Sequence, residues 1–500
     1  MSDRHGLWGI LLKSRHFQYF RSQNPSHGKE QTAAAVTTIR VFSYSYRDMR
    51  LRDTCAPPKS MTVRKPFLKS LNRKSQLLCL LFPILLAAPC VWGDEGVRAA
   101  REPRTVRVYD VEHSIVCGGE DLYCGHPRKT IFGYFGKGEF VAGHRHAPAV
   151  TLRHGLEGYV HLSAIMLQRS MDGGRTWPTK HNVVVYDHTI SDVKKNVFFR
   201  QSCVPREHYN MFRPDSLFYF GWDQPEGNIK SNEEGKPKVC FALRSPDRGR
   251  TWESVPTIIT HPDGTQHSVF KDCHPVLRMP DGKTLLAAMS IQGPGPGVAL
   301  YSSTDHGLSW NFQRRIGVNP GGEGRFTYAG LLFLPNGDLQ LYCMHVGNNE
   351  QGDSCENNIC ITTSEDGGKI WKPLRPIVSQ AGRKAWGWDP SMGDGLGPYK
   401  IYRSPWAIIL NDDRILVTFA RRYRLPIGIG GIISDDGGKT WSNEFVIRKD
   451  ATLGLGDIGY QMGRQIEDGS IVITYYWRNR GLTSRRSGSR FIAASRFKLE

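Results

Sequence analysis

The sequence has 500 residues, of which 39% are hydrophobic and 23% are charged, with 53 glycines and 12 tryptophans. This composition is typical of a globular protein and excludes a collagen-like, coiled-coil or wholly disordered chain. No apolar run reaches the roughly 20 residues that a membrane-spanning helix needs, so we expect no membrane span. Most of the formal charge of +19 lies before residue 94, and residues 94–500 carry +8. The charge therefore does not predict a nucleic-acid partner.

The first 93 residues form two segments that precede the part expected to fold. Residues 61–93 start at Met61 with a basic stretch, continue with an apolar run over 77–89 and end with small residues before Asp94. This order is typical of a secretory signal peptide, so we expect a secreted or periplasmic protein. Residues 1–60 show no usable period, and we expect them to be disordered or to lie upstream of a true start at Met61.

One pattern, Ser-x-Asp-x-Gly-x-x-Trp, occurs five times, and its serines are Ser170, Ser245, Ser303, Ser364 and Ser434. The aspartate can hydrogen-bond the backbone of a tight turn, the glycine supplies a positive φ, and the tryptophan buries against the hairpin. Apolar strands flank the copies, so each box is expected to join two antiparallel strands. A further hairpin signal, such as residues 279–282 or 334–337, precedes most boxes. Two hairpins per repeat predict a four-stranded antiparallel blade.

Six such units fit residues 94–500. They cover roughly 105–190, 198–262, 266–318, 325–379, 399–449 and 457–500, and the last lacks a box. Repeats of this length indicate a propeller. We therefore predict an all-β fold, a six-bladed β-propeller with five Asp-box turns, over residues 94–500. Pairing of a terminal strand with the first blade would close the ring and remove a free sheet edge.

The five boxes resemble the Asp-box repeats of the sialidase superfamily, whose members are six-bladed propellers. The resemblance covers about residues 105–500. It implies an exo-glycosidase of sialidase type that removes terminal acidic sugars from glycans. In that family arginines bind the substrate carboxylate, a tyrosine polarised by a glutamate attacks the anomeric carbon, and an aspartate is the acid/base. Such an enzyme needs a glycan substrate and no cofactor, and we expect a monomer.

The functional face of a propeller is lined by the starts of the innermost strands, so candidate residues lie just before each first hairpin. By the resemblance, Tyr460 would be the nucleophile, Glu323 its polarising base and Asp272 the acid/base. The candidates for substrate binding are Arg213, Arg325, Arg403, Arg422, His274 and Asp457. Arginine suits this role because its planar guanidinium can hold a carboxylate bidentately. Each candidate also has a structural reading, as an axial packing group, a surface charge or a turn residue.

The Phe/Tyr-Arg-Ile-Pro motif that sialidases carry before the first box is missing. Residues 111–114 of the first predicted blade read Val-Glu-His-Ser, and the nearest likeness, Phe212-Arg213-Pro214, follows the first box. Two other functions therefore stay open. One is a non-catalytic glycan-binding propeller. The other is a uronate-directed hydrolase or lyase that uses the same arginines on a uronic acid carboxylate.

Eight cysteines follow residue 93, and none has the CxxC spacing of a metal site. In an exported chain Cys355–Cys360 and Cys117–Cys124 could form local disulfides, or the cysteines could be free and buried. His144 and His146 share one face of a strand, a spacing that can bind a metal. No third ligand is apparent, so we expect no metal. Substrate contact at the mouth, together with His113, is the other role open to them.

Overall fold

The computed structural model describes residues 104–119, 122–148, 163–188, 203–204, 207–223, 239–260, 262, 270–271, 274–291, 297–317, 325–348, 354–379, 401–422, 426–451, 458–479 and 489–500. All of them belong to one compact unit, Asp94–Glu500. The segments 1–60 and 61–93 lie outside the described residues. The described part is almost entirely β-strand, with one short 3-10 helix, η2 (Thr179–His181).

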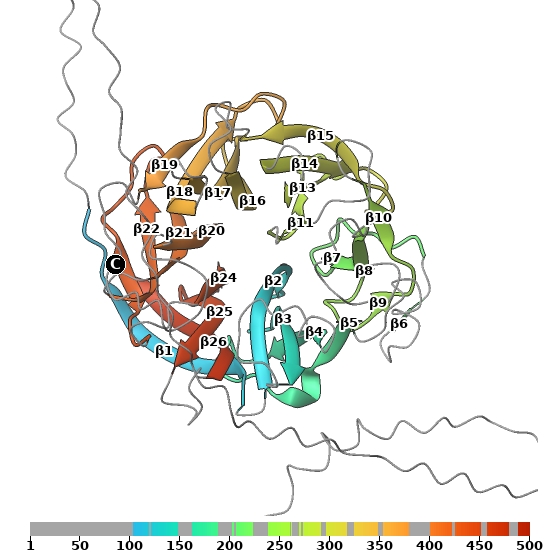
Figure 1. The fold of residues 1–500 in the computed structure, drawn as a ribbon, viewed down its shortest axis with the longest axis horizontal. Coiled ribbons are helices and arrows are strands. Elements are labelled where there is room, and N and C mark those ends of the chain that lie inside the picture. Colours follow the sequence, from blue (N-terminus) through green and yellow to red (C-terminus); the bar gives the residue numbers. More distant parts are fainter. Residues whose placement is uncertain are drawn as a thin grey trace, which may run out of the picture. The chain divides into compact units, whose positions relative to one another are not determined.

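The strands form small antiparallel sheets arranged in a ring, as Figure 1 shows, and the predicted six-bladed β-propeller is confirmed. The first blade contains β2 (Leu122–Tyr134), β3 (Phe140–Pro148), β4 (Ala164–Ser170) and β5 (Val183–Asp187). The second contains, among the described residues, β7 (Leu217–Asp223), β8 (Val239–Ser245) and β10 (Thr257–Ile259), while β6 (Cys203–Val204) pairs with β9 (Trp252–Glu253). The third contains β11 (Phe270–Lys271) and β12 (Leu277–Arg278), which both pair with β13 (Leu285–Ile291), then β14 (Gly297–Ser303) and β15 (Asn311–Ile316).

The remaining three blades each have four strands in the described residues. The fourth contains β16 (Arg325–Phe333), β17 (Leu339–Asn348), β18 (Ser354–Ser364) and β19 (Arg375–Val378). The fifth contains β20 (Tyr402–Ile409), β21 (Ile415–Arg421), β22 (Gly428–Ser434) and β23 (Phe445–Arg448). The sixth contains β24 (Gly459–Gln465), β25 (Ile471–Asn479), β26 (Ser489–Leu499) and, at its outer edge, β1 (Val108–Cys117).

Ring closure differs from the prediction. Strand β1 does not start the first blade; it pairs antiparallel with β26, from Val108 opposite Leu499 to Cys117 opposite Ile492. The last blade has no box and no outer strand of its own, so β26 would otherwise present an unpaired edge. The N-terminal strand supplies that edge, and the first blade begins at β2.

All five boxes form turns between the outer strands of their blades, as predicted, and each box serine donates to the box aspartate. In the third box Ser303 Oγ accepts the Gly307 N–H over 2.8 Å, and Gly307 has a φ of 81°. Trp310 of this box is 6% exposed, and its ring lies edge-on to Phe218 of the second blade at 5.6 Å between centres. The polar residues thus satisfy the turn amides, and Trp310 ties the third blade to the second.

The middle strands are buried on both faces because neighbouring blades pack face to face. Every residue of β13, β21 and β22 is buried. These strands are mostly apolar along their length, and the hydrophobic core therefore runs around the ring between the sheets. No helix in the described part of the chain is long and apolar enough to cross a membrane.

Of the two alternatives for Cys355 and Cys360, the structure excludes a disulfide between them. Both residues lie in β18, where five residues at about 3.3 Å each separate their Cα atoms by about 16 Å, far beyond the reach of a disulfide. Cys360 instead lies opposite Cys343 of β17, and both are buried free thiols. Burial raises the pKa of Cys360 to about 12, so its thiol stays protonated at neutral pH.

Candidate active site

Each blade has two ends, and the register of the boxes distinguishes them. In the fifth blade Ser434 of the box pairs with Ile415, the first residue of β21, whereas Tyr402 at the start of β20 pairs with Arg421 at the last residue of β21. The other boxes show the same register, with the pairs Phe140–Ser170, Leu217–Ser245, Leu285–Ser303 and Leu339–Ser364. The boxes therefore lie at one end of the blades, the box end. The innermost strands begin at the other, the mouth end.

Three innermost strands bring two tyrosines and an arginine together at the mouth end. The hydroxyl oxygens of Tyr460 in β24 and Tyr328 in β16 lie 3.0 Å apart. Arg403 of β20 donates from Nη2 to both oxygens, over 2.9 Å to Tyr328 and 3.3 Å to Tyr460. Both tyrosines are at least 95% buried. The structure thus brings together Tyr460 and Arg403, two of the predicted site residues, and adds Tyr328, which the sequence analysis missed.

A β-bulge with a positive-φ residue recurs in the innermost strands and sets the direction of these side chains. Tyr328 and Tyr460 have positive φ angles of 56° and 60°, and His126 of β2 has one of 47°. Each lies at a break in the pairing of an innermost strand with its neighbour. A side-chain-bearing residue pays about 1–3 kcal/mol for a sparsely populated backbone conformation, and bulges of this kind redirect side chains next to functional sites. Ser404 of β20 has the same feature, with a φ of 49°, so the strained bulge occurs in four innermost strands and marks the mouth end as the candidate site.

His126 completes the surroundings of Tyr460. Its ring lies edge-on to Tyr460 at 5.8 Å between centres and stacks on Tyr476 at 6.2 Å. Tyr123 OH lies 3.4 Å from His126 Nδ1. The sequence analysis missed His126 because it took residues 111–114 as the start of the first innermost strand. Counting back two hairpins from the first box, rather than assigning every upstream strand to that blade, would have placed the start of β2 correctly.

Lys129 and His274 lie beneath this cluster and are both buried. Lys129 Nζ donates to the Pro405 carbonyl over 2.9 Å, and His274 Nε2 lies 2.9 Å from the same oxygen. The His274 ring stacks on Trp406 with 4.3 Å between ring centres. Burial, and then the charge of Lys129, hold the pKa of His274 well below its usual range. His274 is therefore a neutral donor in the floor of the site, and not an open group facing the mouth.

Arg422, another predicted binding residue, supports the backbone that carries Tyr460. It is fully buried, and its Nε donates to the Ile458 carbonyl over 2.7 Å. Gly459, between Ile458 and Tyr460, has a φ of 127°, and a Cβ there would lie 2.8 Å from that of Ala420. The structure thus gives Arg422 a positioning contact two residues before Tyr460.

Four other predicted residues are placed less directly. Arg325 is exposed at the first residue of β16, on the mouth side of Tyr328. Glu323, Asp272 and Asp457 lie outside the described residues, each within five residues of a described member of the site. Their proposed roles stay predictions.

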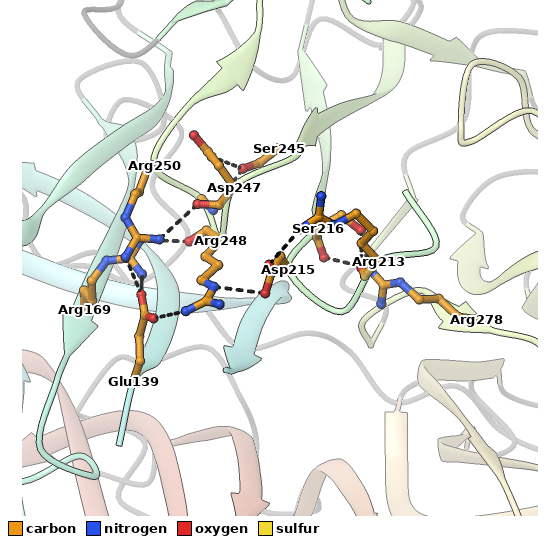
Figure 2. A network of polar contacts seen from close by, with 11 residues as sticks. Glu139, Arg169, Arg213, Asp215, Ser216, Ser245, Asp247, Arg248, Arg250 and Arg278 are labelled. Carbon is orange, nitrogen blue, oxygen red and sulfur yellow. Dashed lines mark hydrogen bonds and ion pairs between the residues drawn. The ribbon is translucent and has the colours of Figure 1, made fainter. Parts of the chain in front are cut away.

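Arg213 is not brought to the cluster. Figure 2 shows it beside Asp215, which it contacts over 3.4 Å, in a network that includes the second box. Leu217 follows this segment and pairs with Ser245, so Arg213 lies at the box end of the second blade. The prediction of Arg213 as a mouth residue is therefore wrong. The segment before β7 leads into a strand that begins at the box end, which the Phe-Arg-Pro likeness could not reveal.

A cavity of about 470 Å³ lies on the box side of His274 and Trp406. Residues from all six blades line it, among them Thr130, Leu217, Arg278, Leu331, Ile408 and Arg464. Tyr460, Tyr328 and Arg403 are not among its lining residues, so the cavity is separate from the candidate site.

The ring of six antiparallel blades, with Asp-box turns at one end and a tyrosine–arginine cluster at the other, defines a propeller of the sialidase superfamily. Residues 217–473 match the family described as BNR repeat-like domain. This match spans half of the chain, and the protein belongs to that family.

Solved structures share the fold at low sequence identity. A protein of unknown function from Dyadobacter fermentans has a TM-score of 0.53 and 20% identity, with 79% of this chain and 99% of that chain covered. The NanB sialidase from Streptococcus pneumoniae has a TM-score of 0.51 and 12% identity, with 77% of this chain and 70% of that chain covered. Among curated proteins none matches the sequence. The similarity to these two proteins is one of fold.

Proposed function

We propose that the protein is an exported exo-glycosidase of sialidase type that cleaves terminal acidic sugars from glycans. The observation that carries the proposal is the Tyr460–Tyr328–Arg403 cluster at the mouth end of the ring. A guanidinium that donates to a phenol oxygen stabilises the negative charge that forms there when the proton leaves. The fold shared with the NanB sialidase agrees with a glycosidase.

The chemistry follows from placing a phenol at the reacting carbon. The Tyr460 oxygen forms a bond to the anomeric carbon as the bond from that carbon to the leaving oxygen breaks. The phenol proton passes to Glu323, and Asp272 gives a proton to the leaving oxygen. Water then releases the sugar and restores Tyr460. A phenol suits a substrate with a carboxylate beside the reacting carbon, because an anionic carboxylate nucleophile would be repelled by it.

The test is Tyr460→Phe, assayed for hydrolysis of an aryl sialoside and an aryl glucuronide. The substitution keeps the ring and its packing but removes the attacking oxygen, so turnover should fall by about 10³-fold or more while stability changes little. Tyr342→Phe is the matched control. Tyr342 is also fully buried, and its hydroxyl donates to Gln340 over 2.6 Å within the fourth blade, away from the cluster.

Two outcomes would count against the proposal. Near-full activity of Tyr460→Phe would exclude a sialidase-type mechanism. No turnover of any acidic aryl glycoside by the wild-type chain would favour a non-catalytic glycan-binding propeller, and binding to a glycan panel would then be the remaining measurement.

A uronate-directed enzyme is the second candidate. Among the described arginines that the sequence singled out, Arg403 contacts Tyr460 and Arg422 contacts backbone. Arg325 is exposed on the mouth side of Tyr328, and Arg213 lies at the box end. One arginine at the cluster is enough for a uronic acid carboxylate. Turnover of the aryl glucuronide but not the sialoside, or release of an unsaturated uronate, would favour this candidate.

A further inference from the structure

A second cluster of reactive side chains lies where the N-terminal strand meets the first blade. Cys117 is the last residue of β1, Cys124 lies in β2 and His144 lies in β3. One ligand atom from each of the three lies within 4.8 Å of those of the other two. Because β1 belongs to the last blade and β2 and β3 to the first, the cluster spans the seam at which the ring closes.

His144 is the unusual member of this cluster. It is fully buried, as is Cys124, and the polar group beside its ring is the Cys117 thiol, which lies outside ordinary hydrogen-bond geometry to either nitrogen. An unsatisfied buried polar group destabilises the folded state, and native proteins rarely leave one without a partner. A neutral imidazole nitrogen is also a common metal ligand, so a cation at this point would satisfy it.

We propose that Cys117, Cys124 and His144 bind a Zn²⁺ ion that fastens the closing strand β1 to the first blade. Two thiolates and an imidazole form a donor set typical of zinc, which takes four ligands in a tetrahedron. His146 supplies the fourth zinc ligand. It is half-buried, shares a face of β3 with His144 at 6.5 Å between ring centres, and pairs directly with Cys124 across the β2–β3 ladder.

The sulfurs of Cys117 and Cys124 lie 2.6 Å apart. Two Zn–S bonds of about 2.3 Å at a tetrahedral angle hold their sulfurs about 3.7 Å apart, so metal binding separates the pair by about 1 Å. A disulfide is the competing arrangement and would draw the sulfurs together. It would leave both nitrogens of His144 without a ligand or a hydrogen-bond partner, whereas a metal ion takes one of them as a ligand together with both sulfurs. The buried imidazole therefore favours the metal.

The experiment measures zinc in the full chain by mass spectrometry of the metal, after reduction of the thiols, incubation with Zn²⁺ and dialysis. We expect about one zinc ion per chain, and near-complete loss of it in Cys124→Ser and in His144→Gln. The wild-type chain should also melt at a lower temperature after chelation. Cys343→Ser is the matched control, because Cys343 is also a buried free cysteine. It lies opposite Cys360 in the β17–β18 ladder and is not part of this cluster.

The same samples test the alternatives. A Cys117–Cys124 disulfide in the intact protein, with no zinc uptake after its reduction, overturns the proposal. Full zinc content in His144→Gln also overturns it. If Cys124→Ser does not fold, replacement of zinc by Co²⁺ in the wild-type chain decides the question, since thiolate ligands give a charge-transfer absorption band and its absence overturns the proposal.

Discussion

Glu139 contacts three arginines in the box-end network of Figure 2, and Glu139→Gln should destabilise the ring strongly. Glu139 is 4% exposed, and its carboxylate accepts hydrogen bonds from Arg169, from Arg248 over 2.7 Å and from Arg250 over 2.8 Å. It lies in the first blade with Arg169, whereas Arg248 and Arg250 belong to the second box. One carboxylate therefore joins two blades.

The magnitude follows from burial. The Arg169 and Glu139 side chains are both 5% exposed, so glutamine leaves a buried guanidinium without its counter-charge, at about 3–5 kcal/mol. Arg248 and Arg250 are 33% and 49% exposed and can return to water, so they add little. For a unit of about 400 residues, 3 kcal/mol corresponds to a melting temperature lower by about 3–4 °C, because the unfolding entropy grows with chain length.

The effect should depend on pH in a stated direction. Burial raises the pKa of Glu139, but the hydrogen bond from Arg248 and the charges of Arg250 and Arg169 outweigh it and place the pKa below its usual value. A lowered pKa in the folded state adds stability above the unfolded pKa of about 4.3, and that stability is lost as pH falls through the folded pKa. The difference between wild type and Glu139→Gln should therefore shrink in acid.

The assay is urea unfolding at pH 7 and at several values below pH 4.5, with melting curves in parallel. Glu365→Gln is the control, because its ion pair with Lys372 joins side chains that are 61% and 59% exposed and should change stability by less than about 1 kcal/mol. Equal stabilities of the two variants at pH 7, or a Glu139→Gln difference that persists undiminished in acid, would refute the reasoning.

Three further predictions concern the fold and the N-terminus. Trp310→Ala removes a buried aromatic that packs on Phe218 and should cost about 3–5 kcal/mol, whereas an unchanged melting temperature would contradict its role in the box. The pKa of His274 is lowered well below its usual range by burial and then by Lys129, so the folded state favours the neutral ring, and stability should decline as pH drops below about 6.5. His274→Gln should flatten that decline in urea unfolding between about pH 6.5 and 5, and an unaltered slope would count against it. Exported protein should begin near Asp94, and N-terminal sequencing that found Met1 or Ser2 would contradict the expected signal peptide.

Closure of the ring links these features to the candidate site. Arg403, Tyr328 and Tyr460 come from three different blades, and His126 from a fourth, so each needs its neighbours in place. The bulges that aim these side chains cost energy, which the packing of the blades must offset.

Local chemistry made the architecture predictable from the sequence. A box such as Ser303–Trp310 is a turn whose hydrogen bonds run among residues at most four apart, so the eight residues specify it wherever they occur. Repetition of that turn, with a hairpin before most copies, was enough to predict six blades. The resemblance, together with the position at the start of an innermost strand, singled out Tyr460 and Arg403, and the structure brings these two side chains together.

Contacts between distant residues were decided only by the tertiary structure. No local sequence pattern predicts that β1 belongs to the last blade, because its partner strand β26 lies almost 400 residues away in the chain. Because β1 pairs with β26, the first innermost strand begins later than the sequence analysis assumed, and His126 was missed. The same pairing places Cys117 beside His144. Arg213 shows the opposite error, since a motif at the start of a strand has meaning only when the position of the strand in its blade is known. Turns are encoded by neighbours in sequence, whereas the site is built from strand order and register, which depend on the closed ring.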